Sequence, residues 1–150
     1  MLPGEEGKIK VVLSTQGYGD MNLKKDIKVH TNDPAEKMIK LMITGGVKRF
    51  ARLDPGIISL KGVLGKPIIA KMTISPTQDN GFDIARVRVK EGQYIRYNIK
   101  KIKDKKLPYY ELTVENTRKV PGRFFDLIMI ETDTSPKRQI NIRVSGYLSN

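Results

Sequence analysis

Apolar and polar residues alternate along several short segments of the chain, a pattern typical of β-strands with one buried and one solvated face. Ile95, Tyr97 and Ile99 give one clear case. Phe124–Ile130 is apolar on both faces, which favours a central strand. Alternation and turn residues together predict seven strands, at Ile57–Lys61, Ile68–Ile74, Phe82–Lys90, Tyr94–Lys101, Tyr109–Glu115, Phe124–Glu131 and Gln139–Tyr147. Seven strands in about 100 residues is the size of an immunoglobulin-like sandwich.

The chain also matches itself at an offset of 101 residues, where Ile9–Val47 lies over Tyr110–Leu148 without a gap. Apolar positions stay in phase through both segments. Both also share the order strand, Gly-containing loop, strand, Thr-led turn, strand. We therefore predict an all-β, immunoglobulin-like sandwich. A complete domain at residues 50–150 is preceded, in residues 1–49, by the last three strands of a truncated repeat.

One segment supports a second interpretation. Asp33, Pro34 and Glu36 before the sequence KMIKLM are typical of a helix start, with an acidic N-cap and Pro at the first helical position. The aligned segment after Pro136, RQINIRV, alternates as a strand does. Because one architecture should serve both copies, we expect a strand here, and a helix is the alternative.

The alternation assigns a core to the complete domain, consisting of Tyr110, Leu112, Val114, Ile128, Ile130, Ile140, Ile142 and Val144. Residues 1–49 repeat this apolar pattern without the other half of a sandwich. Such a segment exposes apolar side chains and strand edges, which favour association. We expect it to pack against the complete domain or to form a homodimer through residues 1–49.

Composition removes several classes of site. The 150 residues include no Cys and a single His. Disulfides, thiolate metal sites, cysteine nucleophiles and any cluster that needs two imidazoles are therefore excluded. No phosphate-binding loop or calcium-loop motif occurs, and we expect no catalytic residues, no metal and no cofactor. The sequence predicts a protein that is not an enzyme.

The sequence shows no transmembrane segment, since no apolar run reaches about 18 residues. It also shows no signal peptide, because no basic start leads into an apolar run. Met1 leads directly into Pro3 and Gly4, which are turn residues normally found between strands. We therefore expect this chain to be part of a longer protein whose upstream region includes any export signal.

Basic residues exceed acidic ones by 28 to 16, a formal net charge of +12. Residues 50–150 hold 19 of the basic and 10 of the acidic residues. If Glu91 and Gly92 close a hairpin, alternation gathers Arg86, Arg88, Lys90, Arg96 and Lys100 on one cationic face, and the basic run that follows adds Lys101 and Lys103. This face is a candidate contact for a polyanion. The alternative is a solvated sheet surface whose charges prevent edge-to-edge pairing.

Residues 3–47 contain a Pro3-Gly4 entry, the loop Gly17–Gly19, the sequence Thr31-Asn32-Asp33-Pro34 and a closing Gly45. In this order of motifs the segment resembles a bacterial domain of unknown function, the one numbered fifteen seventy-three. Residues 50–150 share this resemblance only through the internal repeat. It implies a sandwich related to PapD-like and ASH domains, in a periplasmic or cell-surface protein, without known catalytic residues. Family members often carry a Cys-Gly-Cys motif that this chain lacks, so no redox or metal role is carried over.

These observations favour a non-catalytic immunoglobulin-like repeat from a larger exported bacterial protein, acting as a spacer or protein-interaction module. The alternative is a cationic module that docks on an anionic polymer, a membrane surface or nucleic acid. The two differ in salt dependence, because contacts between Lys or Arg and a polyanion weaken steeply as salt rises.

Overall fold

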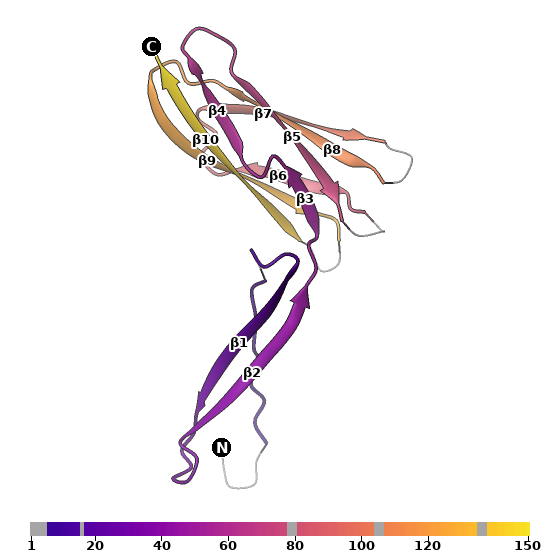
Figure 1. Cartoon of the computed structure of the whole chain (residues 1–150), viewed down its shortest axis with the longest axis vertical. Coiled ribbons are helices and arrows are strands. Elements are labelled where there is room, and N and C mark those ends of the chain that lie inside the picture. Colours follow the sequence, from indigo (N-terminus) through magenta and orange to yellow (C-terminus); the bar gives the residue numbers. More distant parts are fainter. Residues whose placement is uncertain (1–5, 16, 78–80, 104–106, 135–137) are drawn as a thin grey trace. The chain divides into compact units, whose positions relative to one another are not determined.

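The structure is a computed structural model that describes residues 6–15, 17–77, 81–103, 107–134 and 138–150. All regular structure within these ranges is β-strand, ten strands in total (Figure 1). The chain divides into two compact units, Met1–Arg49 and Phe50–Asn150. Among the described residues there is no helix of the length and apolarity that a bilayer crossing requires.

The larger unit is a sandwich of two four-stranded sheets. One sheet has the order β4-β10-β9-β6, formed by Ile58–Val63, Gln139–Ser149, Gly122–Thr132 and Ile84–Val89. The other has the order β3-β5-β8-β7, formed by Ala51–Asp54, Ile69–Pro76, Tyr109–Asn116 and Ile95–Ile102. The first edge of the sandwich is split between the sheets, since β3 pairs antiparallel with β5 and β4 pairs parallel with β10. This strand order is that of an immunoglobulin-like fold, as predicted.

The seven predicted strands are present with shifts of one or two residues at most ends, and Phe124–Ile130 lies in a central strand, β9, as expected. The prediction missed β3. Its four residues, Ala51–Asp54, are too few to show a period of two, and Arg52 and Asp54 interrupt the apolar character. Packing of Phe50, Ala51 and Leu53 against the core explains why the segment is extended.

The core lies between the two sheets and includes all eight predicted side chains, each no more than 7% exposed. Leu112, Val114, Ile128, Ile130 and Ile142 are fully inaccessible to solvent. Facing strands contribute alternate residues, and Ile58, Leu60, Met72 and Ile74 complete the layer. Burial of this continuous apolar layer is what holds the two sheets together.

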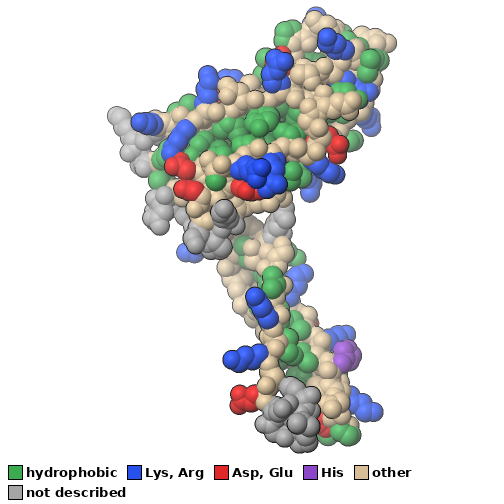
Figure 2. Space-filling view, turned by 180° about the vertical axis from the view of Figure 1, so that it is seen from behind, with side chains coloured by type: hydrophobic (Ala, Val, Ile, Leu, Met, Phe, Trp, Pro, Cys, Tyr) green, Lys and Arg blue, Asp and Glu red, His purple; other side chains and the backbone are tan. Residues whose placement is uncertain are grey.

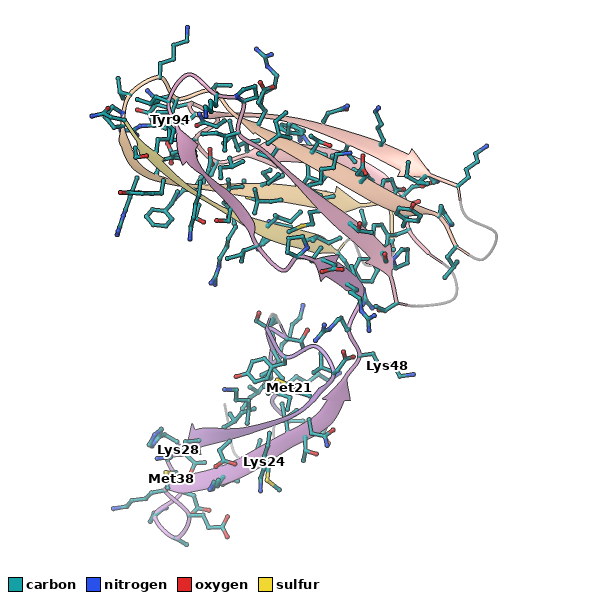
Figure 3. The ribbon with its side chains drawn as sticks, turned by 45° about the horizontal axis from the view of Figure 1, so that its top comes forward. Met21, Lys24, Lys28, Met38, Lys48 and Tyr94 are labelled. Atoms are coloured by element: carbon teal, nitrogen blue, oxygen red, sulfur yellow. The ribbon has the colours of Figure 1, made fainter. Side chains whose placement is uncertain are left out.

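Gly146 shows how tightly one end of the core is packed. The ring of Phe124, its partner across β9 and β10, lies over the glycine. A Cβ atom at position 146 would be 1.9 Å from Cε1 of Phe124. The same ring packs against Tyr94, with ring centroids 5.5 Å apart (Tyr94 is labelled in Figure 3). The absence of a side chain at Gly146 therefore creates the space that the aromatic ring fills.

The smaller unit contains a hairpin of β1, Met21–His30, and β2, Met38–Val47. The predicted strand near Asp33–Leu41 is thus confirmed over the helix, and Asp33 instead accepts a hydrogen bond from the amide of Ala35 in the turn. The expectation of three strands in residues 1–49 is wrong, because residues 6–15 form no strand. Their aligned strand, β8, pairs with β5 and β7. Among the described residues of this unit, neither partner has a counterpart.

The hairpin has the same register as β9 and β10. Met21 pairs with Val47 and His30 with Met38, while Gly122 pairs with Leu148 and Glu131 with Gln139. Each residue of the hairpin pairs lies 101 positions before its counterpart in β9 or β10. The turns correspond as well, since the amide of Thr31 donates to the carbonyl of Lys37 and that of Thr132 donates to the carbonyl of Arg138, both at 3.0 Å.

Candidate interaction surface

The proposed cationic face is divided by the fold. Strands β6 and β7 follow one another in sequence but belong to different sheets, β6 beside β9 and β7 beside β8. Arg86 and Arg88 therefore lie on one sheet, and Arg96 and Lys100 on the other. The expected hairpin between these strands is wrong, because the chain crosses from one sheet to the other at Glu91 and Gly92.

The half-buried carboxylate of Asp126 holds this crossing in place. Asp126 of β9 accepts hydrogen bonds from the amides of Glu91, at 3.1 Å, and Gly92, at 2.9 Å. Gly92 has a φ of 68°, a conformation that glycine adopts without strain. A sequence Glu-Gly between two strands fits a hairpin equally well, so local pattern alone does not reveal the change of sheet.

The seven basic residues have separate surroundings. Arg88 forms an ion pair with Glu131 of the neighbouring strand, and Lys101 forms one with Asp83. Arg86, Lys90, Arg96, Lys100 and Lys103 are exposed. In Figure 2 the Lys and Arg side chains on the visible face are spread over both units, with acidic side chains among them. These residues therefore do not form one continuous patch, and whether any of them contacts a polyanion stays a prediction.

Lys101 belongs to a polar cluster at one end of the sandwich. Besides the ion pair with Lys101, Asp83 accepts a hydrogen bond of 2.7 Å from the hydroxyl of Tyr110. The same hydroxyl lies 3.1 Å from the carbonyl oxygen of Phe82. The backbones of Asp83 and Asp133 are also joined, because the amide of Asp133 donates to the carbonyl of Asp83 and the amide of Asp83 donates to the carboxylate of Asp133.

This cluster shifts two titrations in opposite directions. The hydrogen bond from Lys101, followed by that from Tyr110, lowers the pKa of the Asp83 carboxyl below its usual value. Burial, together with the adjacent Asp83 carboxylate, raises the pKa of the Tyr110 hydroxyl well above its usual value. Neither group is prepared for proton transfer near neutral pH, since Asp83 is ionised and Tyr110 is neutral there. The cluster thus fastens the loops at this end of the sandwich.

The outer face of the β4-β10-β9-β6 sheet carries a different combination of residues. Phe125 of β9 points away from the core and is 75% exposed, and Tyr147 of β10 is 47% exposed. The guanidinium carbon of Arg123 lies 5.5 Å from the centre of the Tyr147 ring. Together with Lys61 of β4, these side chains border an open hollow of about 460 Å³. We call Lys61, Arg123, Phe125 and Tyr147 the aromatic patch.

Strand register explains why these residues meet. Tyr147 pairs with Arg123 on one side and with Lys61 on the other, so the three lie in one row across the sheet. Phe125 pairs with Ser145 in the next outward row, where the small hydroxyl leaves the ring uncovered. Farther along the same face lie Arg143, Arg88 and Arg86, against the single carboxylate of Glu131. The patch is therefore aromatic and open, with Lys61 and Arg123 in its first row and Arg143 in the row beyond Phe125.

Sequence reasoning missed the aromatic patch. The available signal was the strand Phe124–Ile130, which is apolar on both faces although only one face of a sandwich sheet meets the core. The outward residue Phe125 needed an explanation that the position of the strand does not supply. Within the described residues, no group of three or more His, Asp and Glu side chains is placed to hold a metal ion.

Comparison with known proteins finds weak structural similarity. No protein-family model matches the chain, and no curated protein matches it in sequence. Among solved structures, it is similar to "mouse clustered PcdhgC3 EC1-3", with a TM-score of 0.46, 10% identity, and coverage of 86% of this chain and 42% of that one. Protocadherin Gamma C5 EC1-3 gives a TM-score of 0.46 and 11% identity, over 89% and 44% of the two chains. The chain thus spans less than half the length of these structures.

Proposed function

We propose that residues 50–150 act as a non-catalytic immunoglobulin-like repeat in a larger exported bacterial protein, as a spacer and protein-interaction module whose contact surface is the aromatic patch. The observation that carries this proposal is Phe125, a large apolar side chain left 75% exposed on an inner strand of its sheet. The resemblance of residues 3–47 to the bacterial domain numbered fifteen seventy-three supports the exported, periplasmic or cell-surface setting.

The composition of the patch favours a protein partner. Tyr, Phe and Arg are enriched at the centres of protein interfaces, where they supply rigid contact area and several hydrogen-bond donors. Single-stranded nucleic acid needs several free aromatic faces on which successive bases stack. Here Arg123 already lies against one face of Tyr147, and only Phe125 is widely open. The positive charges of Lys61, Arg123 and Arg143 favour a partner segment that carries Asp or Glu beside an apolar side chain.

Selection of peptide ligands tests this proposal. The full chain is immobilised, and random peptides displayed on phage are selected for binding at physiological salt. Selected peptides are then measured against Phe125→Ser and against Ile69→Ser. The latter removes a side chain that is 55% exposed on the other sheet and is the matched control. We expect acidic peptides whose affinity falls about 30-fold or more with Phe125→Ser, the loss typical of a central aromatic contact, and changes little with Ile69→Ser.

The alternative function gives a different result. A cationic docking module would bind heparin or single-stranded DNA with an affinity that falls by orders of magnitude between low and moderate salt. Replacement of Arg86, Arg88 and Arg96 by Ser would remove that binding. Such a result, or peptide binding that Phe125→Ser leaves unchanged, would contradict a protein-contact role for the aromatic patch.

A further inference from the structure

The hairpin of the smaller unit has one apolar face and one polar face. The apolar face carries Met21, Leu23, Ile27 and Val29 of β1 together with Ile39, Leu41, Ile43 and Val47 of β2. The other face carries Lys24, Asp26 and Lys28, and Asp26 is paired with Lys40 at 2.9 Å (Lys24 and Lys28 are labelled in Figure 3). Such two-sided strands normally pack their apolar face against a second layer.

The corresponding face of the larger unit is fully covered. Ile140 and Ile142 are 7% and 0% exposed beneath the second sheet, whereas the aligned Ile39 and Leu41 are 39% and 47% exposed. Leu23, at one end of the hairpin face, is already buried at 4% exposed, so the uncovered part is the one that carries Ile39 and Leu41. Each core position of β9 and β10 has an apolar counterpart in the hairpin, in the same register. The sequence and backbone of the hairpin thus fit a sandwich whose other half is not among the described residues.

We propose that the occupant of this face is the front half of an immunoglobulin-like repeat, five strands equivalent to β3 through β7, joined to Ile9 as residues 50–109 are joined to Tyr110. This inference rests on the proposal that the chain is built from such repeats. In the completed unit, residues 9–15 form the strand equivalent to β8. A strand of the β6 type pairs with β1, and one of the β4 type pairs in parallel with β2. Both free edges of the hairpin are then covered.

Charge argues against a second copy of this chain as the occupant. The chain carries a formal net charge of +12, and each hairpin holds Lys25 on its apolar face. Two such faces in contact would bury like charges, which costs energy unless each charge is paired. Lys25 stands at the position of Asp126, the residue that accepts hydrogen bonds from the turn between β6 and β7. A front half that fits Lys25 therefore places a carboxylate or free carbonyl groups in that turn.

An extended chain tests the proposal, because residues 50–109 of the larger unit can serve as the added front half. In the extended chain, a second copy of residues 50–109 replaces residues 1–8. Ile9 then follows Tyr109 directly and takes the place of Tyr110. Hydrogen exchange is compared between the full chain and the extended chain. We expect the amides of residues 9–15 and of both hairpin strands to exchange at least about 100-fold more slowly in the extended chain. The reason is that these amides become hydrogen-bonded within a sheet. A second version with Lys25→Asp restores the acceptor for the Glu91–Gly92 turn and should exchange no faster.

Two substitutions in the added half provide the matched comparison. Met72→Asp places a charge in the apolar layer, where Met72 is 1% exposed, and should abolish the new protection. Lys71→Glu changes the adjacent outward residue, which pairs with Glu111 in the native unit and would face Lys10 in the new one. It should keep the protection.

The opposite results are equally clear. If neither version of the extended chain protects residues 9–15 and the hairpin, the front-half occupant is wrong. If the full chain is a dimer at micromolar concentration and Leu41→Asp makes it a monomer, the occupant is a second copy, and the proposal is also wrong. Either failure leaves the peptide-binding test of Phe125 unaffected, because that residue lies in the larger unit.

Discussion

Replacement of Gly146 by Ala should destabilise the larger unit through a single contact. The added Cβ would lie 1.9 Å from Cε1, 2.3 Å from Cζ and 2.5 Å from Cδ1 of Phe124. Carbon atoms in contact prefer separations of about 3.5–4.0 Å, so the ring must move by about 1.5 Å or more. Phe124 is only 6% exposed and is packed against Tyr94, so the shift disturbs the core around it.

The expected cost lies between two limits. Forcing extra volume into a packed core costs about 1–3 kcal/mol, and complete loss of a buried Phe side chain costs about 3–5 kcal/mol. Reduced freedom of the unfolded chain offsets about 0.4–1 kcal/mol. We therefore expect Gly146→Ala to lower the free energy of unfolding by about 3 kcal/mol, which corresponds to a fall in Tm of about 12–24 °C for a unit of this size.

Urea denaturation followed by circular dichroism measures this change. Gly56→Ala is the control in the same unit, because nothing lies within 4 Å of a Cβ at that position, and it should leave stability unchanged or raise it by up to about 1 kcal/mol. Combining Gly146→Ala with Phe124→Leu should recover part of the loss, since the smaller side chain relieves the overlap. If Gly146→Ala has the stability of the wild type, the ring of Phe124 does not lie over Gly146, and the packing described for this end of the core is wrong.

Four further changes test other parts of the structure. Ile142→Ala should destabilise the larger unit by about 2–5 kcal/mol in the same assay, and a loss below about 0.5 kcal/mol would mean that the strand phase is wrong. Because the pKa of Tyr110 is raised in the folded state, its contribution to stability is present below about pH 10 and is lost as the pH rises further. Tyr110→Phe should flatten that decline and remove one late-ionising tyrosine from the ultraviolet titration, and an unchanged titration would contradict the burial of this hydroxyl. Replacing the exposed Arg86, Arg88 and Arg96 by Ser should change the free energy of unfolding by less than about 1 kcal/mol, because surface ion pairs contribute little. If the variant is unfolded, these side chains are buried and the strand phase is wrong. Deleting residues 1–48 should leave a folded monomer in light scattering and circular dichroism, and an unfolded product would mean that the larger unit depends on the smaller one.

The sequence predicted most of the larger unit because its strands are long enough to show alternation. All eight expected core residues are buried, and the repeat offset anticipated a shared register that the hairpin reproduces pair by pair. The errors arose where the outcome depends on contacts distant in sequence. Whether the chain turns back or crosses to the other sheet at Gly92 is decided by Asp126, 34 residues away. Whether residues 9–15 form a strand depends on neighbours that the described part of the smaller unit does not contain.

The prediction of the candidate surface also failed where contacts distant in sequence decide the arrangement. The expected grouping of basic residues assumed that β6 and β7 are neighbours, and it failed with that assumption. The aromatic patch instead combines residues from three strands, and Lys61 meets Tyr147 only through the parallel pairing of β4 with β10. A pairing between the first and last parts of a domain leaves no local trace in the sequence, so neither the patch nor its hollow was visible there.

The parallel pairing of β4 with β10 also determines how the larger unit responds to tension. These strands lie near the two ends of the unit, and six residue pairs join them, from Ile58 with Val144 to Val63 with Ser149. When Phe50 and Asn150 are pulled apart, the force slides two parallel strands along one another. All six pairs are then loaded at once, whereas an antiparallel hairpin opened from its end would lose its hydrogen bonds one by one. Apart from the four residues of β3, the unit therefore keeps its length until all six pairs separate together, a mechanical property that suits the spacer role proposed above.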